Sequence, residues 1–413
     1  MSNSVIPGPA GLPGVGSVIP YQRDRLRFLM EGYRRYGEVV RFDFLGFHGA
    51  VLHGAAANRY ILVDNYENFL WGPVIDRARA RWIVGEGLVF IDEPEHGQQR
   101  RLIMPAFHRQ RFDDYQRIIR ETTSRVLDRW QPGVKLDIAT QMNELTLIVE
   151  GLTMFTLDME GEARALGQAV FEVVYNMSDP LRVAFARLPF NLPGLGRGAS
   201  LRRALIRIDT VLNEIIVRHE REGTDTGDVV SMLVAARDEE GGRLSASQVR
   251  DHLLTLFVAA HETVSDTLAW TFYLLAQHPV VTAKLLRELD QELHGEPPTA
   301  ADLVRLPYLE QVVKESLRCY PPAASLLRIA REGFTWQGYH LPAGSLVVFS
   351  PFTSHHMPSQ FPEPEVFRPE RFDPAVGEPP SSYAFIPFGG GPRACMGASF
   401  AMMELKTVVA MVL

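Results

Sequence analysis

Apolar positions recur every three or four residues through most of the chain, and this spacing predicts helices. The clearest predicted helices are 94–104, 111–130, 138–155, 201–221, 247–277, 280–293 and 309–319. Alternating and β-branched runs occur at 39–44 and 50–53 and again at 338–349, which predicts short strands at opposite ends of the chain. We expect a small sheet that pairs these ends, and a fold that is mainly α with minor β.

The longest predicted helix, 247–277, follows the cap-competent Ser245 and ends before His278 and Pro279. At 1.5 Å per residue it would be about 45 Å long, enough to cross a domain. It is largely apolar, but Arg250, Asp251, His261, Glu262 and Asp266 interrupt it too often for a bilayer span. We therefore predict a central core helix.

Composition narrows the classes of function. The 413 residues are 46% hydrophobic and 22% charged, and no linker divides them, so one domain spanning 1–413 is expected. A net charge of −7 gives no positive field for nucleic acid. Only Cys319 and Cys395 are cysteines, which argues against a disulfide framework and favours the cytoplasm. The N-terminus has no basic region followed by a long apolar run, so we expect neither a signal peptide nor a transmembrane anchor.

The segment FIPFGGGPRACMG places three glycines and a proline before Cys395, and a helix-like run begins directly after it. Glycines permit positive φ and let the backbone approach a flat cofactor closely. Amide groups and the positive end of the following helix would favour a thiolate. The alternative is a tight turn that carries a buried free cysteine.

The run FGGGPRAC, with Gly397 two residues on, resembles the heme-binding signature of the cytochrome P450 family. The resemblance implies a triangular prism of helices around heme, with small β-sheets. It implies that Cys395 is the axial ligand of the iron of heme b, where a thiolate favours O–O cleavage. Phe388, Gly389 and Gly397 would form the loop around that ligand.

Glu315 and Arg318 lie three residues apart on a predicted helix, so their side chains can pair. Alone, they would be read as an ordinary surface ion pair. The later segment FRPERF adds Arg371, and the three resemble the Glu-Arg-Arg network of the family. That resemblance assigns them to folding and heme retention.

The segment VAAHETVSDT resembles the oxygen-activation motif of the family. Thr263 would deliver protons to bound dioxygen, with Glu262 as the relay. Ala259 and Ala260 leave room for a local opening of the helix, although the family more often has glycine at the second position. Alternatively, Thr263 bonds back to the carbonyl four residues earlier and Glu262 is a solvated helix residue. The zinc motif HExxH is excluded, because Ser265 replaces its second histidine.

Several basic residues match the family's contacts to heme propionates. His96 and Arg100 lie four residues apart and therefore on one helix face. Arg328 follows the Pro-Pro turn, and Arg393 precedes Cys395 by two residues. Each alone would be read as a surface residue.

By resemblance, 71–90 is the variable segment over the heme. Apolar residues of this segment and of a second segment, 323–326, could line a pocket. The candidates are Trp82, Ile83, Val84, Leu88 and Phe90, with Ala323, Ala324, Ser325 and Leu326. Plain core packing is the alternative for the first group. The apolar character predicts a fatty acid, terpenoid, steroid or polyketide-like substrate.

No flavin or nicotinamide module is visible, so electrons from NAD(P)H would arrive through a reductase and a ferredoxin or flavodoxin. Arg101, Arg109, Arg111 and Lys406 are candidate contacts for that acidic partner. We expect a monomer and a monooxygenase that hydroxylates or epoxidises its substrate with O2. Alternatives are a peroxygenase or isomerase on the same fold, and a non-catalytic heme sensor or carrier. Because the sequence stops within the helix after the cysteine, a C-terminal β region of the family is expected to be truncated.

Overall fold

The computed structural model describes residues 5–11, 16–44, 46–77, 81–107, 111–156, 162–177, 197–223, 226–237, 241–376 and 380–413. The chain divides into two units. Unit 1 consists of Met1–Val74, Tyr273–Leu285 and Pro307–Cys395. Unit 2 consists of Ile75–Phe272, Leu286–Leu306 and Met396–Leu413.

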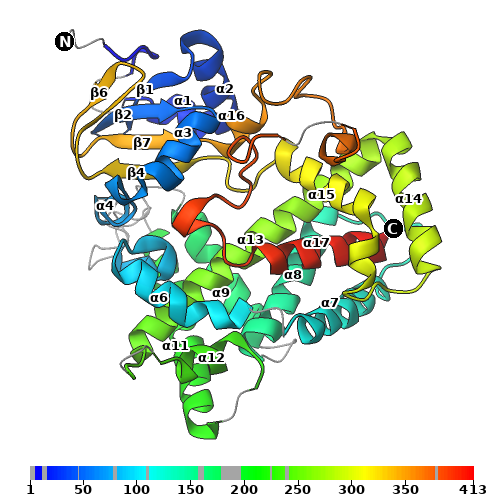
Figure 1. Ribbon diagram of the computed structural model, residues 1–413. Helices are drawn as coiled ribbons and strands as arrows, with labels where there is room; N and C mark the ends of the chain where they lie inside the picture. The colour runs from blue at the N-terminus through cyan, green and yellow to red at the C-terminus, as the bar shows by residue number, and fades with distance from the viewer. Residues whose placement is uncertain are drawn as a thin grey trace. The chain divides into compact units, whose positions relative to one another are not determined.

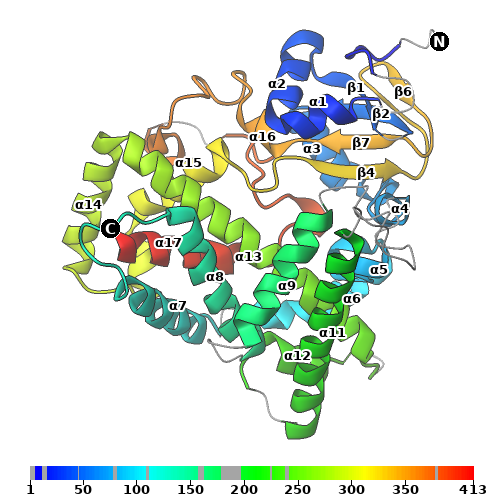
Figure 2. The ribbon, with the colours of Figure 1, turned by 180° about the vertical axis from the view of Figure 1, so that it is seen from behind.

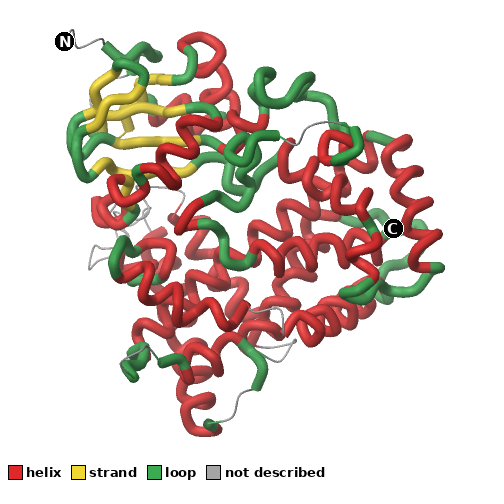
Figure 3. Tube along the Cα trace, in the orientation of Figure 1, coloured by secondary structure: helices red, strands yellow, loops and turns green. Residues whose placement is uncertain are grey.

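Both sheets belong to unit 1 (Figures 1 and 3). The larger has the order β1 (Val39–Phe44), β2 (Phe47–Leu52), β7 (Leu346–Phe349), β4 (Leu326–Ala330) and β3 (Phe69–Leu70). Strands β2 and β7 are parallel, and the other neighbours are antiparallel. The prediction that the two ends of the chain share a sheet is therefore confirmed.

The stretch 338–349, where short strands were predicted, does contain strands. This segment forms two strands, β6 (Tyr339–Leu341) and β7, and β6 pairs instead with β5 (Phe334–Trp336) in a separate two-stranded sheet. Pro342 has no amide hydrogen for a ladder, and Gly344 has a φ of +80°, so the chain turns between the two strands.

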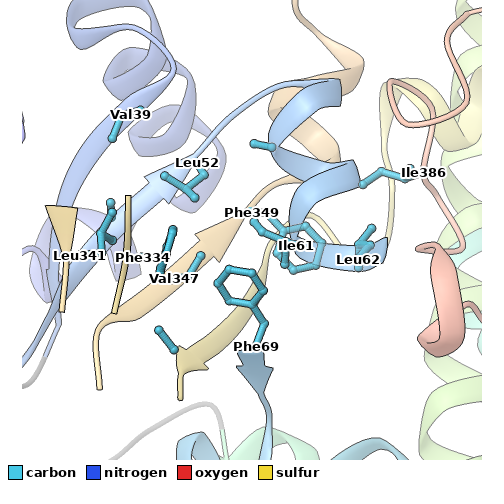
Figure 4. Packing of buried hydrophobic residues seen from close by; sticks show 13 residues of the cluster. Val39, Leu52, Ile61, Leu62, Phe69, Phe334, Leu341, Val347, Phe349 and Ile386 are labelled. Atoms are coloured by element: carbon cyan, nitrogen blue, oxygen red, sulfur yellow. The ribbon is translucent and has the colours of Figure 1, made fainter. Parts of the chain in front are cut away.

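One face of the larger sheet carries an apolar core. Val39, Leu52, Val347 and Phe349 pack there with residues of the neighbouring loops and helices, and all four are at most 3% exposed. Ile386, which precedes the cysteine loop, belongs to the same core (Figure 4). The segment that leads to Cys395 is thus anchored in the sheet core.

Unit 1 contains the helices α1 (Val18–Arg23), α2 (Arg25–Tyr36), α3 (Ala55–Arg59), α15 (Pro307–Cys319) and α16 (Pro351–His355), together with the π-helical turn η1 (Tyr60–Asp64) and short 3-10 turns. Two of them have side-chain N-caps: Asp24 accepts a hydrogen bond from the Arg27 amide, and Ser350 accepts one from the Thr353 amide. Helix α4 (Gly72–Arg77) begins in unit 1 and ends in unit 2.

Unit 2 is helical. It contains α5 (Arg81–Val84), α6 (Glu95–Ile103), α7 (Phe112–Leu127), α8 (Ile138–Phe155), α9 (Glu162–Met177), α11 (Arg197–Glu222), α12 (Val229–Ala235), α17 (Ala398–Val412) and the larger parts of α13 (Ala246–Gln277) and of α14 (Pro279–Leu293). Helix α9 packs along α11, and α7 packs against both α8 and α17 (Figure 2).

All seven predicted helices are present, with ends that differ from the prediction by at most four residues. The prediction of a mainly α fold with minor β is confirmed. In the described part of the chain, no helix is both long and apolar enough to cross a membrane.

Candidate active site

The cysteine loop of unit 1 has a backbone that two of its glycines make possible. Gly389 and Gly391 have φ of +69° and +63°, whereas Gly390 is extended. A Cβ on Gly391 would lie 2.0 Å from the Leu62 carbonyl oxygen of η1. The Cys395 amide donates to the Phe388 carbonyl at 2.9 Å and closes the curl. The positive φ values agree with the conformational role that the sequence analysis predicted for these glycines.

His355 holds the start of this loop, a role that sequence reasoning missed. The Ile386 amide donates to its Nε2 at 2.9 Å, so the proton of the neutral ring is on Nδ1. Burial lowers the pKa of His355 to about 3. Its carbonyl accepts a bond from Arg318 at 3.0 Å. His355 therefore links the Glu-Arg-Arg network to the cysteine loop. The two adjacent histidines in SHHMP match no motif that would have predicted this role from the sequence.

The structure brings Glu315, Arg318 and Arg371 together in unit 1. Glu315 Oε2 accepts from Arg318 Nε at 2.7 Å, and Oε1 accepts from Arg318 Nη2 at 2.9 Å and from Arg371 Nε at 3.1 Å. Arg371 also donates to the carbonyls of Glu363 and Val366. Burial acts to lower the Arg318 pKa, but the hydrogen bond and charge of Glu315 outweigh it and the pKa is raised. The network is thus a fixed ion cluster with multiple partners.

The two cysteines have different surroundings. Cys319 is buried beside Arg318, and burial raises the pKa of its thiol to about 12, so it stays protonated. Cys395 is exposed in its loop. Of the two, only Cys395 has an accessible sulfur for a cofactor.

Other predicted site residues of unit 1 lie on β4 and beside it. Arg328 is 5% exposed, and its guanidinium lies 5.0 Å from the ring centre of Trp71 and 5.5 Å from that of Phe349. Ser325 shares a 2.9 Å hydrogen bond with the Tyr21 hydroxyl. Ala323, Ala324 and Leu326 are half-buried, and Arg393 ends the 3-10 turn η8 (Gly391–Arg393) before Cys395.

In unit 2, helix α13 carries Thr263 and Glu262. It is continuous through Ala259 and Ala260, so the expected local opening is not present. The Thr263 hydroxyl donates to the Ala259 carbonyl at 2.8 Å, which is the alternative that the sequence left open. Alanine at both small positions favours helix, and this explains the unbroken backbone.

Glu262 is only partly buried, and its surroundings favour the protonated acid. Burial raises its pKa, and the charge of Asp266 adds to the effect. Next to it, His261 is buried, and its Nδ1 lies 3.1 Å from the Thr146 hydroxyl of α8. Burial lowers the His261 pKa to about 4, so this ring is neutral near pH 7.

His96 and Arg100 both lie on α6, as their spacing predicted. His96 is 4% exposed, and its Nδ1 lies 2.8 Å from Glu93 Oε1. The same carboxylate accepts a bond from the Gly97 amide at 3.0 Å. The Glu93 carboxylate therefore orients the imidazole ring of His96.

The predicted pocket residues at 82–90 are all in unit 2. Ile83, Val84 and Leu88 are at most 6% exposed, so core packing accounts for much of their contact. Trp82 and Phe90 are half-buried. Gly397 precedes α17, with an ideal Cβ position 3.8 Å from the Phe107 ring.

Comparisons with known proteins agree with these features. A family model described as Cytochrome P450 matches residues 6–413. Cyclooctatin synthase of Streptomyces melanosporofaciens is 32% identical over 97% of this chain and 87% of its own. Pentalenene oxygenase of Streptomyces avermitilis is 32% identical over 98% and 89%. The structure of retinoic acid bound cyanobacterial CYP120A1 matches with a TM-score of 0.87 and 27% identity, over 99% of this chain and 91% of that chain.

These matches define a class of oxidoreductase, the heme-thiolate monooxygenases. The chain belongs to the cytochrome P450 family.

Proposed function

We propose that this protein is a terpenoid monooxygenase in which Cys395 is the axial ligand of heme b. The observation that carries the proposal is the cysteine loop, because its backbone conformation needs Gly389 and Gly391 and leaves the sulfur accessible. A thiolate is a donor that heme iron accepts, so the chemistry of the residues fits this group.

When bound, heme supplies oxygen activation and transfer of one oxygen atom to a C–H or C=C bond. The protein's contribution is to hold and orient the group. Arg328, Arg393, Arg100 and the Nε2 of His96 are donors suited to two propionates. The Glu315 cluster keeps the cysteine loop in place through Arg318 and His355.

Proton delivery is assigned to Thr263 and Glu262. Burial and Asp266 raise the pKa of Glu262, so its carboxyl holds a proton more readily than an exposed glutamate, which suits a relay. The Thr263 hydroxyl has a helix carbonyl as its acceptor, so rotation about its side chain must free it to serve. Thr263→Ala should retain heme and oxygen consumption but lose most product, whereas Thr263→Ser should keep coupling. Equal coupling in the two variants would contradict this role.

Electrons are proposed to come from NAD(P)H through a reductase and a ferredoxin or flavodoxin, with the protein acting as a cytoplasmic monomer. Arg101 is exposed on α6 and can meet an acidic partner. Lys406 is less available, since its ammonium donates to the Leu303 carbonyl at 3.2 Å. Arg109 lies outside the described residues. Reduction should slow as salt increases.

Terpenoid is the substrate class that the relatives favour. Their names refer to cyclooctatin, cyclooctat-9-en-7-ol and pentalenene, and the structural neighbour binds retinoic acid. These compounds share a large apolar skeleton, in accord with the apolar residues at 82–90.

The test is oxygenation of a panel of cyclic terpenes by the purified holoprotein with NADPH, a surrogate ferredoxin and its reductase. The proposal predicts a product that carries one oxygen atom from labelled O2, and none from the Cys395→Ser variant. Products only with hydrogen peroxide would favour the peroxygenase. Absence of any product, despite an intact thiolate spectrum, would contradict a terpenoid monooxygenase.

A further inference from the structure

A tight loop of unit 2 lies directly on the core helix. Gly85, Glu86 and Gly87 follow α5, and the Glu86 amide donates to Asp251 Oδ2 on α13 at 2.8 Å. Gly85 has a φ of +61°, and a Cβ there would lie 2.1 Å from the Asp251 carboxylate. A Cβ on Gly87 would lie 1.8 Å from Thr255 Oγ1. A side chain at Gly85 or Gly87 would therefore displace the loop or the Asp251 and Thr255 side chains from their present contact.

The same aspartate belongs to an ion cluster that reaches a third element. Arg250 Nη1 donates to Asp251 Oδ1 at 2.8 Å, and Arg250 Nε donates to Asp209 Oδ1 of α11 at 2.8 Å. The side chains of Arg250 and Asp251 are 14% and 15% exposed, while that of Asp209 is 46% exposed. These ion pairs are partly shielded from water, so they are stronger than exposed pairs.

Asp251 and Arg250 are charged residues near the start of this core helix. Their partners are the 85–87 loop and α11. The loop continues directly into the buried Leu88 and the half-buried Phe90. The Asp251 carboxylate thus fixes the backbone between residues 82–84 and residues 88–90 of the first group of predicted pocket residues.

We propose that Asp251 is a positioning residue for ligand entry: it latches the 85–87 loop to α13 and, through Arg250, to α11, and so limits how fast bulky apolar ligands reach and leave the heme. This rests on the proposed function, because it places residues 82–90 at the substrate chamber. The latch has two arms of unequal kind. One is a hydrogen bond to a backbone amide, and the other is an ion pair.

The test uses the holoprotein and two iron-binding probes, imidazole and a triphenylmethyl-substituted imidazole, followed by stopped-flow absorbance. Asp251→Ala removes both arms and should speed dissociation of the bulky probe about tenfold. Asp251→Asn keeps an oxygen acceptor for the Glu86 amide and should have a smaller effect. Asp209→Asn removes only the charge of the arm to α11 and should act least. Imidazole should bind within about twofold of wild type in all three, since a small ligand needs no opening.

Salt gives a second readout. High salt should speed release of the bulky probe from the wild type and have little effect in Asp209→Asn, whose ion pair is already absent. Arg117→Gln is the matched control, because Arg117 forms ion pairs with Asp114 and Glu121 at the surface of α7. It should leave both probes unchanged.

The failures are distinguishable. Loss of the thiolate spectrum in the wild type would reject the proposed function. With that spectrum intact, unchanged release of the bulky probe from Asp251→Ala would overturn the latch. Equal acceleration of both probes would also overturn it, because general loosening does not discriminate by size. If Asp251→Ala does not fold, Asp251→Asn and Asp209→Asn decide the matter on the same criteria.

Discussion

Both units contain fully buried glutamates, Glu315 in unit 1 and Glu150 and Glu404 in unit 2. Their carboxyl groups differ in whether hydrogen-bond donors surround them. Glu315 of unit 1 accepts hydrogen bonds from Arg318, Arg371 and the Arg368 amide. Glu404 of α17 and Glu150 of α8, both in unit 2, are electrostatically coupled. None of their carboxyl oxygens has a hydrogen-bond partner among the described residues. Burial raises the pKa of Glu404 to about 8 and, with the charge of Glu404, raises that of Glu150.

The difference shows that partners, rather than burial, decide the state of a buried acid. Two guanidinium groups with good geometry surround Glu315, which is the centre of an ion cluster. Without a cation, a buried carboxyl takes up a proton, because an uncompensated charge costs more than protonation. The first arrangement holds the cysteine loop, and the second makes stability depend on pH.

The largest expected effect comes from Arg318→Lys. Lysine cannot serve Glu315 with two donors and reach the His355 carbonyl as well, so the buried cluster would lose about 3–5 kcal/mol and heme would be lost. Heme content and urea unfolding measure this. Arg305→Lys is the matched control at an exposed pair with Asp302, where little change is expected. Normal heme content in Arg318→Lys would refute the role of the cluster.

Neighbouring glycines of the cysteine loop provide a smaller, paired effect. Gly391→Ala should cost more than about 2 kcal/mol and reduce heme binding, because it combines positive φ with a clash at the Leu62 carbonyl. Gly390→Ala should be mild, since its backbone is extended and the nearest atom is on the Tyr383 side chain at 3.2 Å. Thermal unfolding of the two holoproteins tests this, and equal losses would argue against the steric explanation.

Glu404→Gln should remove part of the pH dependence of stability. The folded protein keeps a proton on Glu404 up to a pKa of about 8, whereas the unfolded chain releases it near 4.5. Wild-type stability should therefore fall as pH rises from 4.5 to 8. The glutamine variant should match the wild type near pH 5 and already exceed it by about 2 kcal/mol at pH 6.5. The unfolding free energy of both proteins is measured in urea at each pH. If it changes with pH equally in the two proteins, the raised pKa of Glu404 is contradicted.

His355 should give the smallest effect, with the opposite dependence on pH. Its folded pKa of about 3 lies below the 6.5 of an unfolded histidine, so its contribution to stability is complete above 6.5 and declines as pH falls toward 3. His355→Leu should leave the Ile386 amide without an acceptor and cost about 1–2 kcal/mol even at pH 7. His355→Gln should restore most of this. The carbon-monoxide spectrum at decreasing pH measures loop integrity, and equal behaviour of the two variants would contradict the hydrogen bond's importance.

Sequence periodicity predicted the helices well, and 138–155 coincides with α8, because apolar residues that recur at helical spacing favour a helix locally. It also placed Glu315 and Arg318 on one helix. It could not predict His355, Asp251 or the pairing of Glu150 with Glu404. Each of these depends on a partner from a distant segment, and a glutamate within MMELKTVV reads like any helical residue. The continuity of α13 at Ala260 was missed because the family motif suggested an opening that this chain's alanine does not favour.

The most direct test of the heme-thiolate site is the absorption spectrum of the reduced, carbon-monoxide-bound protein in the wild type and in Cys319→Ser and Cys395→Ser variants. We predict the red-shifted thiolate band in the wild type and in Cys319→Ser, and its loss in Cys395→Ser. A thiolate band that survives in Cys395→Ser, or a wild type without one, would contradict the assignment of Cys395.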